Sequence, residues 1–324
     1  MNEPPSAEVS AEPPTAVLRT ADRQRDLLIG YACAAGGAFL FSTKAIIIKL
    51  GYGEGLNAET LIALRMVLAL PVYGVIGWIS VRERLCTGRS LPDIGLVWRA
   101  AAVGVLGYWF ASYTDFLGLL YISAQFERLI LFTYPAFVVL FGALFFAQPI
   151  RARTLFGIAI SYAGLSLIFA TRLTTLGADV AKGAGLVLAA AIGFALYQLF
   201  AKGLIGKIGP RLFTCIAMSA AAGVAILQFV LTQPLASLIV SEKVLLYGLL
   251  LAIGATVLPS FLLNTALGRI SAQANATIGT LSPVATIVLA VFILGEHFGP
   301  VDAAGTVLVL AGVGWFTLAD RRRP

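Results

Sequence analysis

Long apolar stretches recur along almost the whole chain, and each is long enough to cross a lipid bilayer as a helix, which needs about 20 mostly apolar residues. They lie near residues 28–50, 60–80, 100–120, 123–147, 153–171, 184–204, 211–232, 244–267, 271–294 and 300–318. Only 12% of the 324 residues are charged, whereas soluble domains carry about 25%. The sequence therefore predicts an all-α integral membrane protein with ten transmembrane helices.

Basic residues favour one side of this predicted arrangement. With a cytoplasmic N-terminus, the inner loops and tails hold most of the Lys and Arg residues, and the outer side keeps only Lys49, Arg172, Lys182 and Lys243. The positive-inside rule then predicts that both termini are cytoplasmic. We expect a multi-pass protein of the cytoplasmic (plasma) membrane with lipid around it. Its net charge of +7 is assigned to inner loops, not to a nucleic-acid-binding surface.

The second half of the chain repeats the first, because residues 112–168 align with residues 260–316 without a gap. The matched positions include Ile122-Ser123-Ala124-Gln125 with Ile270-Ser271-Ala272-Gln273, and Pro135 with Pro283. A unit of five helices crosses the membrane an odd number of times, so its second copy must enter from the opposite side. We therefore expect two inverted five-helix repeats, an architecture in which secondary transporters place a central site between the copies.

Four segments follow from this organisation. Residues 1–26 are rich in Pro, Ala and Glu and then mixed in charge, which predicts a disordered cytoplasmic tail. Residues 27–172 form the first predicted repeat and residues 183–319 the second. Residues 320–324 form a short basic cytoplasmic tail.

Several short motifs carry a resemblance to a known family. The first half contains Gly107-Tyr108, Gly118-Leu119-Leu120-Tyr121-Ile122-Ser123-Ala124, Pro135, Gly157 and Ala163-Gly164; the second contains Ile270-Ser271-Ala272, Pro283, Leu294-Gly295-Glu296, Gly305 and Ala311-Gly312-Val313. In order and spacing they resemble a drug/metabolite transporter of the EamA type. The resemblance implies a ten-helix bundle with a central substrate cavity and cytoplasmic termini. One position departs from the repeat: Gly295-Glu296 stands where the first copy has Ala147-Gln148, so only the second copy offers a charge there.

Five charged residues fall inside predicted spans: Lys44, Arg65, Asp115, Glu127 and Arg128. A charge in hydrocarbon costs several kcal/mol unless it is paired or hydrated, and the helical rise places all five at one level in the outer half. Our hypothesis is that they line the outward part of a cavity. The two acids would then exchange protons or bind an ammonium group, and a basic residue would hold a carboxylate or phosphate. The alternative is that they pair with one another or snorkel to the interface.

Neutral polar and aromatic residues complete the candidate site. They are Tyr197, Gln198, Asn264 and Asn275 in the second copy, and Trp109 and Tyr113 beside Asp115 in the first. A cavity that is charged outside and polar but neutral inside would suit a substrate with both charges, such as an amino acid. The alternative is that these side chains merely bond helix to helix.

Proline and glycine positions predict how the helices bend and pack. Pro135 and Pro283 lie near the middle of their spans, where proline removes a donor and bends the helix. Each is interpreted as a hinge or, alternatively, as a structural kink. Each copy also has two glycines that lie seven residues apart, Gly157 and Gly164 in the first and Gly305 and Gly312 in the second. They predict close helix contacts.

These observations predict a secondary transporter that exports a small polar metabolite, such as an amino acid or a related compound, by alternating access. The sequence shows no P-loop, no metal-ligand cluster and no dinucleotide motif, so we expect neither enzymatic activity nor a cofactor. The alternative is a membrane enzyme or lipid-handling protein that uses its buried charges for acid/base chemistry. Substrate identity, direction, coupling to protons and oligomeric state stay open.

Overall fold

The computed structural model describes residues 14–146, 152–176, 179–279 and 281–321, and within these ranges it contains helices and no strands. The helices of the first half are α1 (Pro14–Ser42), α2 (Lys44–Gly53), α3 (Ala58–Cys86), α4 (Ile94–Gly104), η1 (Val105–Phe110), α5 (Ala111–Gly118), α6 (Ala124–Leu131), α7 (Tyr134–Phe146) and α8 (Ala152–Leu176). Those of the second half are α9 (Asp179–Ile208), α10 (Pro210–Thr232), η2 (Leu235–Leu238), α11 (Glu242–Leu249), η3 (Leu250–Val257), α12 (Leu258–Arg269), α13 (Ala272–Ile278), α14 (Leu281–Leu294) and α15 (Pro300–Arg321).

Seven helical stretches in the described part are long and apolar enough to cross a membrane: Gln24–Gly53, Ala58–Cys86, Ile94–Gly118, Ala124–Phe146, Asp179–Ile208, Pro210–Thr232 and Glu242–Arg269. Shorter apolar helices occupy Leu155–Thr171, Ser282–Leu294 and Pro300–Gly312, where the sequence predicts the remaining spans. The predicted all-α membrane fold is confirmed, while a full crossing by each of the three shorter helices stays a prediction.

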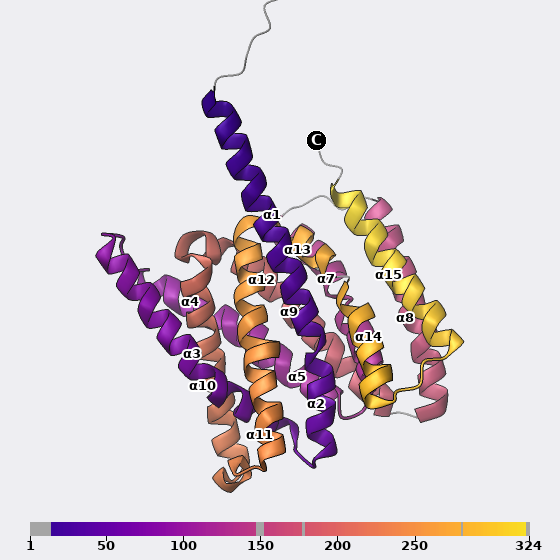
Figure 1. Ribbon diagram of the computed structural model, residues 1–324. Helices are drawn as coiled ribbons and strands as arrows, with labels where there is room; N and C mark the ends of the chain where they lie inside the picture. Colours follow the sequence, from indigo (N-terminus) through magenta and orange to yellow (C-terminus); the bar gives the residue numbers. More distant parts are fainter. Residues whose placement is uncertain (1–13, 147–151, 177–178, 280, 322–324) are drawn as a thin grey trace, which may run out of the picture.

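Corresponding helices of the two halves run in opposite directions (Figure 1). At one end of the bundle Asn57, which precedes α3, donates a hydrogen bond to Gln233, which follows α10. At the other end Arg211 near the start of α10 pairs with Glu83 near the end of α3. Helices α3 and α10, the second helix of each copy, are therefore antiparallel, as inverted repeats require.

The N-terminal helix begins earlier than the sequence predicts. Helix α1 starts at Pro14, inside the range predicted as a disordered tail, and the stretch from Pro14 to the first span contains no further proline or glycine to stop a helix. Asp26 of α1 pairs with Arg269 at the end of α12. The start of α1 and the end of α15 lie at the same end of the bundle (Figure 1), which we call the termini end.

Three of the spans that the sequence predicts are interrupted. Helix α1 gives way to α2 at Thr43, α6 to α7 at Phe132-Thr133, and α13 to α14 around Gly279. The second and third breaks come just before Pro135 and Pro283, so each proline sits in the first turn of a new helix, where its missing N–H costs least. The first break has no proline; there the Thr43 hydroxyl donates to the carbonyl of Leu40, a bond that bends helices.

The third span of each copy contains a widened, π-helical segment. The segment η1 lies between α4 and α5, and η3 lies between α11 and α12. Such segments occur often at functional sites. No sequence pattern predicted them, but their recurrence at matching places supports the duplication.

The predicted glycine contacts join the last helices of the two copies, α8 and α15. A Cβ atom at Gly164 would lie 2.6 Å from the carbonyl oxygen of Gly305. A Cβ atom at Gly312 would lie 2.5 Å from the carbonyl oxygen of Gly157 and 2.4 Å from the backbone nitrogen of Ser161. The backbones therefore meet directly, and the two helices are again antiparallel.

We expect Gly312→Ala to lower the melting temperature of the purified protein, because overpacking a backbone contact typically costs about 1–3 kcal/mol. Gly314→Ala in the same helix is the matched control, since a Cβ atom there meets nothing within 4 Å. Thermal unfolding in detergent measures both. Equal melting temperatures for the two variants would contradict the close packing of α8 on α15.

Candidate functional site

A cavity with an empty volume of about 480 Å³ lies where the three interrupted spans meet. Its lining residues are Ala38, Phe41, Arg128, Leu131, Phe132, Tyr134, Phe194, Gln198, Leu263, Asn275, Gly279 and Ser282. They come from both copies, and residues beside every one of the three breaks are among them. Non-helical backbone at membrane depth is tolerated where it lines a cavity, so the breaks and the cavity form one feature.

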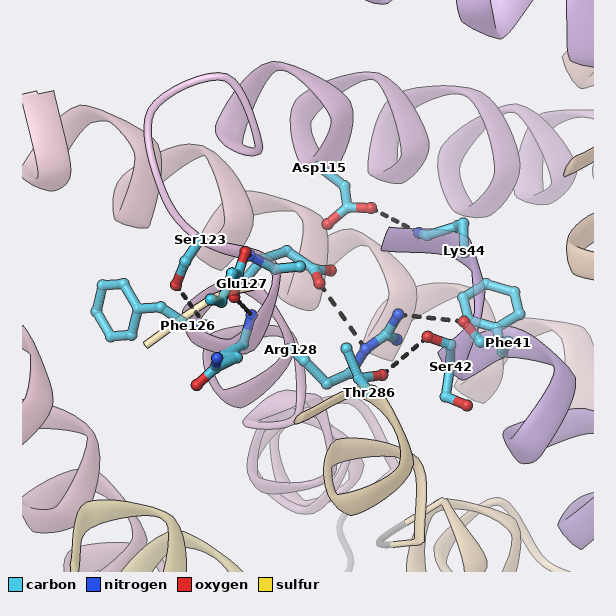
Figure 2. A network of polar contacts seen from close by, with 12 residues as sticks. Phe41, Ser42, Lys44, Asp115, Ser123, Phe126, Glu127, Arg128 and Thr286 are labelled. Carbon is cyan, nitrogen blue, oxygen red and sulfur yellow. Dashed lines mark hydrogen bonds and ion pairs between the residues drawn. The ribbon is translucent and has the colours of Figure 1, made fainter. Parts of the chain in front are cut away.

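A buried ion pair lies behind this cavity. Nζ of Lys44, the first residue of α2, is 2.5 Å from Oδ2 of Asp115 in α5 (Figure 2). The two side chains are 3% and 1% exposed. The break after Ser42 allows Lys44 to begin a new helix that faces α5, and the pair fixes the first span of the first copy on the third.

Arg128 in α6 reaches from the charged cluster into the cavity. Its Nη2 donates a 3.1 Å hydrogen bond to the carbonyl oxygen of Phe41, which the break in the first span exposes (Figure 2). Its Nε lies 3.8 Å from Oε2 of Glu127, too far for a hydrogen bond, and has no hydrogen-bond partner. The guanidinium group is thus anchored at one edge and leaves donors free at another.

Glu127 is fully buried, and neither of its carboxylate oxygens has a hydrogen-bond partner. Its charged neighbours include Arg128, whose Nε is 3.8 Å from Oε2, and Asp115, whose Oδ1 has no hydrogen-bond partner. A buried carboxylate without hydrogen bonds is costly. Glu127 is therefore the group in this cluster that gains most from taking up a proton or a new partner.

Arg65 in α3 is buried and lies with its guanidinium carbon 5.0 Å from the centre of the Phe116 ring. Its Nε and Nη2 have no hydrogen-bond partner, and no described carboxylate forms an ion pair with it. The buried charged residues of the described chain are then three cations and two carboxylates: Lys44, Arg65, Arg128, Asp115 and Glu127. With all five ionised, the cluster carries one positive charge in excess.

The second copy has a neutral network in the corresponding place. Oη of Tyr197 in α9 donates to Oδ1 of Asn264 in α12 at 2.5 Å. This bond joins the first and third spans of the second copy, just as the ion pair of Lys44 with Asp115 joins those of the first copy. Nδ2 of Asn264 donates to Thr214 and to Tyr108. Tyr197 and Asn264 are therefore bonded to each other and do not line the cavity.

Gln198 and Asn275 do line the cavity, from α9 and α13. Nδ2 of Asn275 donates to Oε1 of Gln198 at 3.4 Å, while Oδ1 of Asn275 has no partner. Ser282, beside the third break, lines the same cavity with an unpaired Oγ. Together with Arg128, these residues put unsatisfied polar atoms from both copies on one cavity.

The two aromatic candidates of the third span face elsewhere. Nε1 of Trp109 donates to Oε1 of Gln228 in α10 at 2.7 Å, and Tyr113 donates to Glu59 in α3 at 3.2 Å. Their rings stack with an interplanar angle of 4°. Neither residue belongs to the lining of the cavity.

The structure thus places Arg128, Gln198 and Asn275 on the cavity. Lys44, Asp115 and Glu127 lie next to its lining residues Phe41 and Arg128, and Arg65 lies beside Phe116. Sequence reasoning missed the aromatic lining residues Phe41, Phe132, Tyr134 and Phe194 and the polar Ser282. Most stand within two residues of a break, so the hydroxyl pair Ser42-Thr43 and the two prolines are the signals that could have found them.

The end of the bundle opposite the termini is closed by a contact between the copies. Backbone N–H groups of Ala124 and Gln125, at the start of α6, donate to the carboxylate of Glu296 at 2.7 and 3.2 Å. Glu296 follows α14 of the second copy. The negative charge of Glu296 is stabilised there by the positive end of the α6 helix dipole. The matching Ala147-Gln148 of the first copy lies outside the described residues.

Near the termini end the arrangement is different. A second hollow, with an empty volume of about 860 Å³, is lined by Phe146, Leu199, Phe200, Lys202, Gly203, Ser271 and Ala272. It lies nearer the ends of α7 and α9 and the start of α13 than the central cavity does. Beside it, Nζ of Lys202 donates to the carbonyl oxygens of Leu267 and Ile270 around the end of α12, where a cation is favourable. Lys202 thus caps the end of α12.

Two inverted copies of a helical unit, with a cavity between interrupted spans, define a polytopic membrane protein of the secondary-transporter architecture. The model of the EamA-like transporter family matches residues 28–170 and 181–318, once for each copy. The chain therefore belongs to the EamA-like transporter family, as the sequence resemblance indicated.

Two relatives agree with this assignment, and a solved structure shares the fold. An uncharacterized transporter, YcbK of Bacillus subtilis, is 28% identical over 284 residues, which cover 86% of this chain and 87% of that protein. A probable amino-acid metabolite efflux pump of Salmonella typhimurium is 30% identical over 200 residues, 59% of this chain and 66% of that protein. A crystal structure matches with a TM-score of 0.65 at 18% identity, covering 92% of this chain and 98% of that chain, and shows the fold.

We expect Lys44→Met or Asp115→Leu alone to destabilise the protein by about 3–5 kcal/mol, because each leaves an uncompensated buried charge. The double variant Lys44→Met/Asp115→Leu removes both charges and should be more stable than either single variant. Thermal unfolding of the three purified proteins measures the interaction. Strictly additive losses would show that the pair is not coupled.

Proposed function

We propose that this membrane protein is a secondary transporter that exports a small polar metabolite, such as an amino acid or a related compound, by alternating access. The observation that carries the proposal is the central cavity, which both inverted copies line and all three helix breaks border. A cavity at this place becomes accessible from either side when one copy rocks against the other. The name of the Salmonella relative supports efflux of an amino-acid metabolite.

The two ends of the bundle support one particular state. Glu296 holds the copies together at one end, and the second hollow lies near the termini end. Basic residues of the loops favour the termini end as the cytoplasmic side. In this assignment both termini are cytoplasmic and the cavity of the described state faces inward, so that the outward-facing state requires Glu296 to leave α6.

We further propose coupling to protons through Glu127. Protonation removes the charge that holds Glu127 near Arg128, and it leaves the guanidinium group free for a substrate. Asp115 shares this role less readily, because Lys44 is bonded to it. A proton and a substrate would then use the same group of residues in alternation.

The proposal is tested with purified protein in proteoliposomes, in which uptake and counterflow of amino acids and organic acids and amines are measured with and without a pH gradient. We expect the pH gradient to drive accumulation of the substrate against its concentration gradient. Glu127→Gln should abolish this accumulation, while counterflow persists. Arg211→Gln is the control, because Arg211 is 53% exposed and pairs with Glu83 on the surface. Formation of a product without vectorial movement would favour a membrane enzyme instead.

A second prediction concerns the closed end. In a variant whose own cysteines are replaced by serine, a cysteine introduced by Gln125→Cys should react slowly with an impermeant maleimide added outside, because Gln125 is only 4% exposed. Adding Glu296→Ala removes the contact with α6 and should speed the reaction several-fold. Glu54→Ala, which removes an exposed outer-loop ion pair with Lys243, is the matched control. An unchanged rate in Glu296→Ala would mean that Glu296 does not hold this end closed.

A further inference from the structure

We infer that the central cavity binds a monocarboxylate with an aromatic or apolar body and no second charge. The inference rests on the proposed transport function and names the class of compound that the cavity recognises. It differs from the zwitterion that the sequence alone favoured. The reason is the distribution of charge around the cavity.

The cavity is electropositive. Arg128 is the one charged residue among its lining residues in the described chain. Behind it, the buried cluster has one cation more than it has carboxylates. An anion entering the cavity would balance this excess, and at low local dielectric such attraction is much stronger than in water.

Arg128 is oriented to receive a carboxylate. One terminal nitrogen is fixed on the carbonyl oxygen of Phe41, so the planar group cannot turn freely. Its Nε lies 3.8 Å from Oε2 of Glu127 and donates no hydrogen bond. A guanidinium edge with free donors matches the two oxygens of a carboxylate. The break in the first span therefore has a direct consequence for binding, because it exposes the carbonyl that aims this side chain.

The rest of the polar lining is neutral. Oδ1 of Asn275 and Oγ of Ser282 lack partners and can accept a hydrogen bond from a hydroxyl or amide group of the ligand. An ammonium group would lose its hydration, meet only neutral acceptors and be repelled by Arg128. Because burying a charge without a counter-charge is costly, a free amino acid should bind more weakly than its hydroxy analogue.

The apolar wall favours a ring. Tyr134 packs edge-on against Phe194 with a distance of 5.2 Å between ring centres, and both line the cavity with Phe41. Aromatic groups of a ligand can add to such an arrangement by edge or offset contacts.

Three probes that share a phenyl ring and differ in charge separate the alternatives: 3-phenyllactate, phenylalanine and phenethylamine. Binding of each labelled probe to the purified full-length protein is measured by equilibrium dialysis at pH 7. We expect 3-phenyllactate to bind at least tenfold more tightly than phenylalanine, and phenethylamine to bind more weakly still. Arg128→Gln should lose at least tenfold in affinity for 3-phenyllactate, while the surface control Arg211→Gln should lose none.

A charge reversal provides a test that does not depend on Arg128→Gln folding. Asn275→Asp places a carboxylate on the cavity, so it should lower the affinity for 3-phenyllactate and raise the affinity for phenylalanine. Asn275→Ala is the neutral control and should leave the order of the probes unchanged. If 3-phenyllactate binds no better than phenylalanine to the unmodified protein, or if Asn275→Asp leaves their ratio unchanged, the inference is wrong.

Transport separates this outcome from failure of the proposed function. Counterflow of phenylalanine or phenethylamine in proteoliposomes, with no preference for 3-phenyllactate, would overturn the carboxylate inference and leave the transporter intact. Tight binding of 3-phenyllactate that depends on Arg128, without any movement across the membrane, would support the cavity chemistry and overturn transport.

Discussion

The structure depends on one constraint: backbone polar groups within a bilayer must find hydrogen-bond partners inside the protein. A helix can be interrupted there only where another group takes up the freed donors and acceptors. At the first break, Arg128 bonds the carbonyl of Phe41, and the hydroxyl of Thr286 donates to the carbonyl of Ser42 (Figure 2). The residues that bond the freed carbonyls, Arg128 and Thr286, thus come from the fourth and ninth predicted spans. Of these, Arg128 lines the cavity together with Phe41.

This repair explains why charged residues are tolerated at such depth. Lys44 begins a new helix and pairs with Asp115, and Arg128 donates a hydrogen bond to the backbone carbonyl of Phe41. Only part of the charge is compensated, because Arg65 has an aromatic ring beside it but no carboxylate. A well-packed apolar group at Arg65 would avoid this cost, so the uncompensated charge is a feature that stability alone does not explain.

The sequence predicted the fold well because hydrophobic length, charge bias and an ungapped repeat all report on membrane spans. It predicted depth within a helix but not the direction of each side chain. Hence Asn264 and Trp109, at suitable depth, are bonded to neighbouring helices, whereas Asn275 reaches the cavity. The break at Thr43 was not foreseen, because Ser and Thr bend helices only in some contexts. The aromatic lining was hidden among many equivalent apolar residues.

The bonds inside each copy differ in kind from those between copies. Within the first copy the first and third spans are joined by a buried ion pair, and within the second by the short bond of Tyr197 to Asn264. Across the copies the buried polar contacts of the described residues are neutral, as between Tyr108 and Tyr197, and such bonds average about 0.6 kcal/mol in membranes. The charged contacts between the copies lie towards the ends of the bundle: Glu296 with α6, Glu54 with Lys243, Glu83 with Arg211 and Asp26 with Arg269. Separating the two copies at either end would therefore break charged contacts, whereas the buried polar contacts between them are neutral.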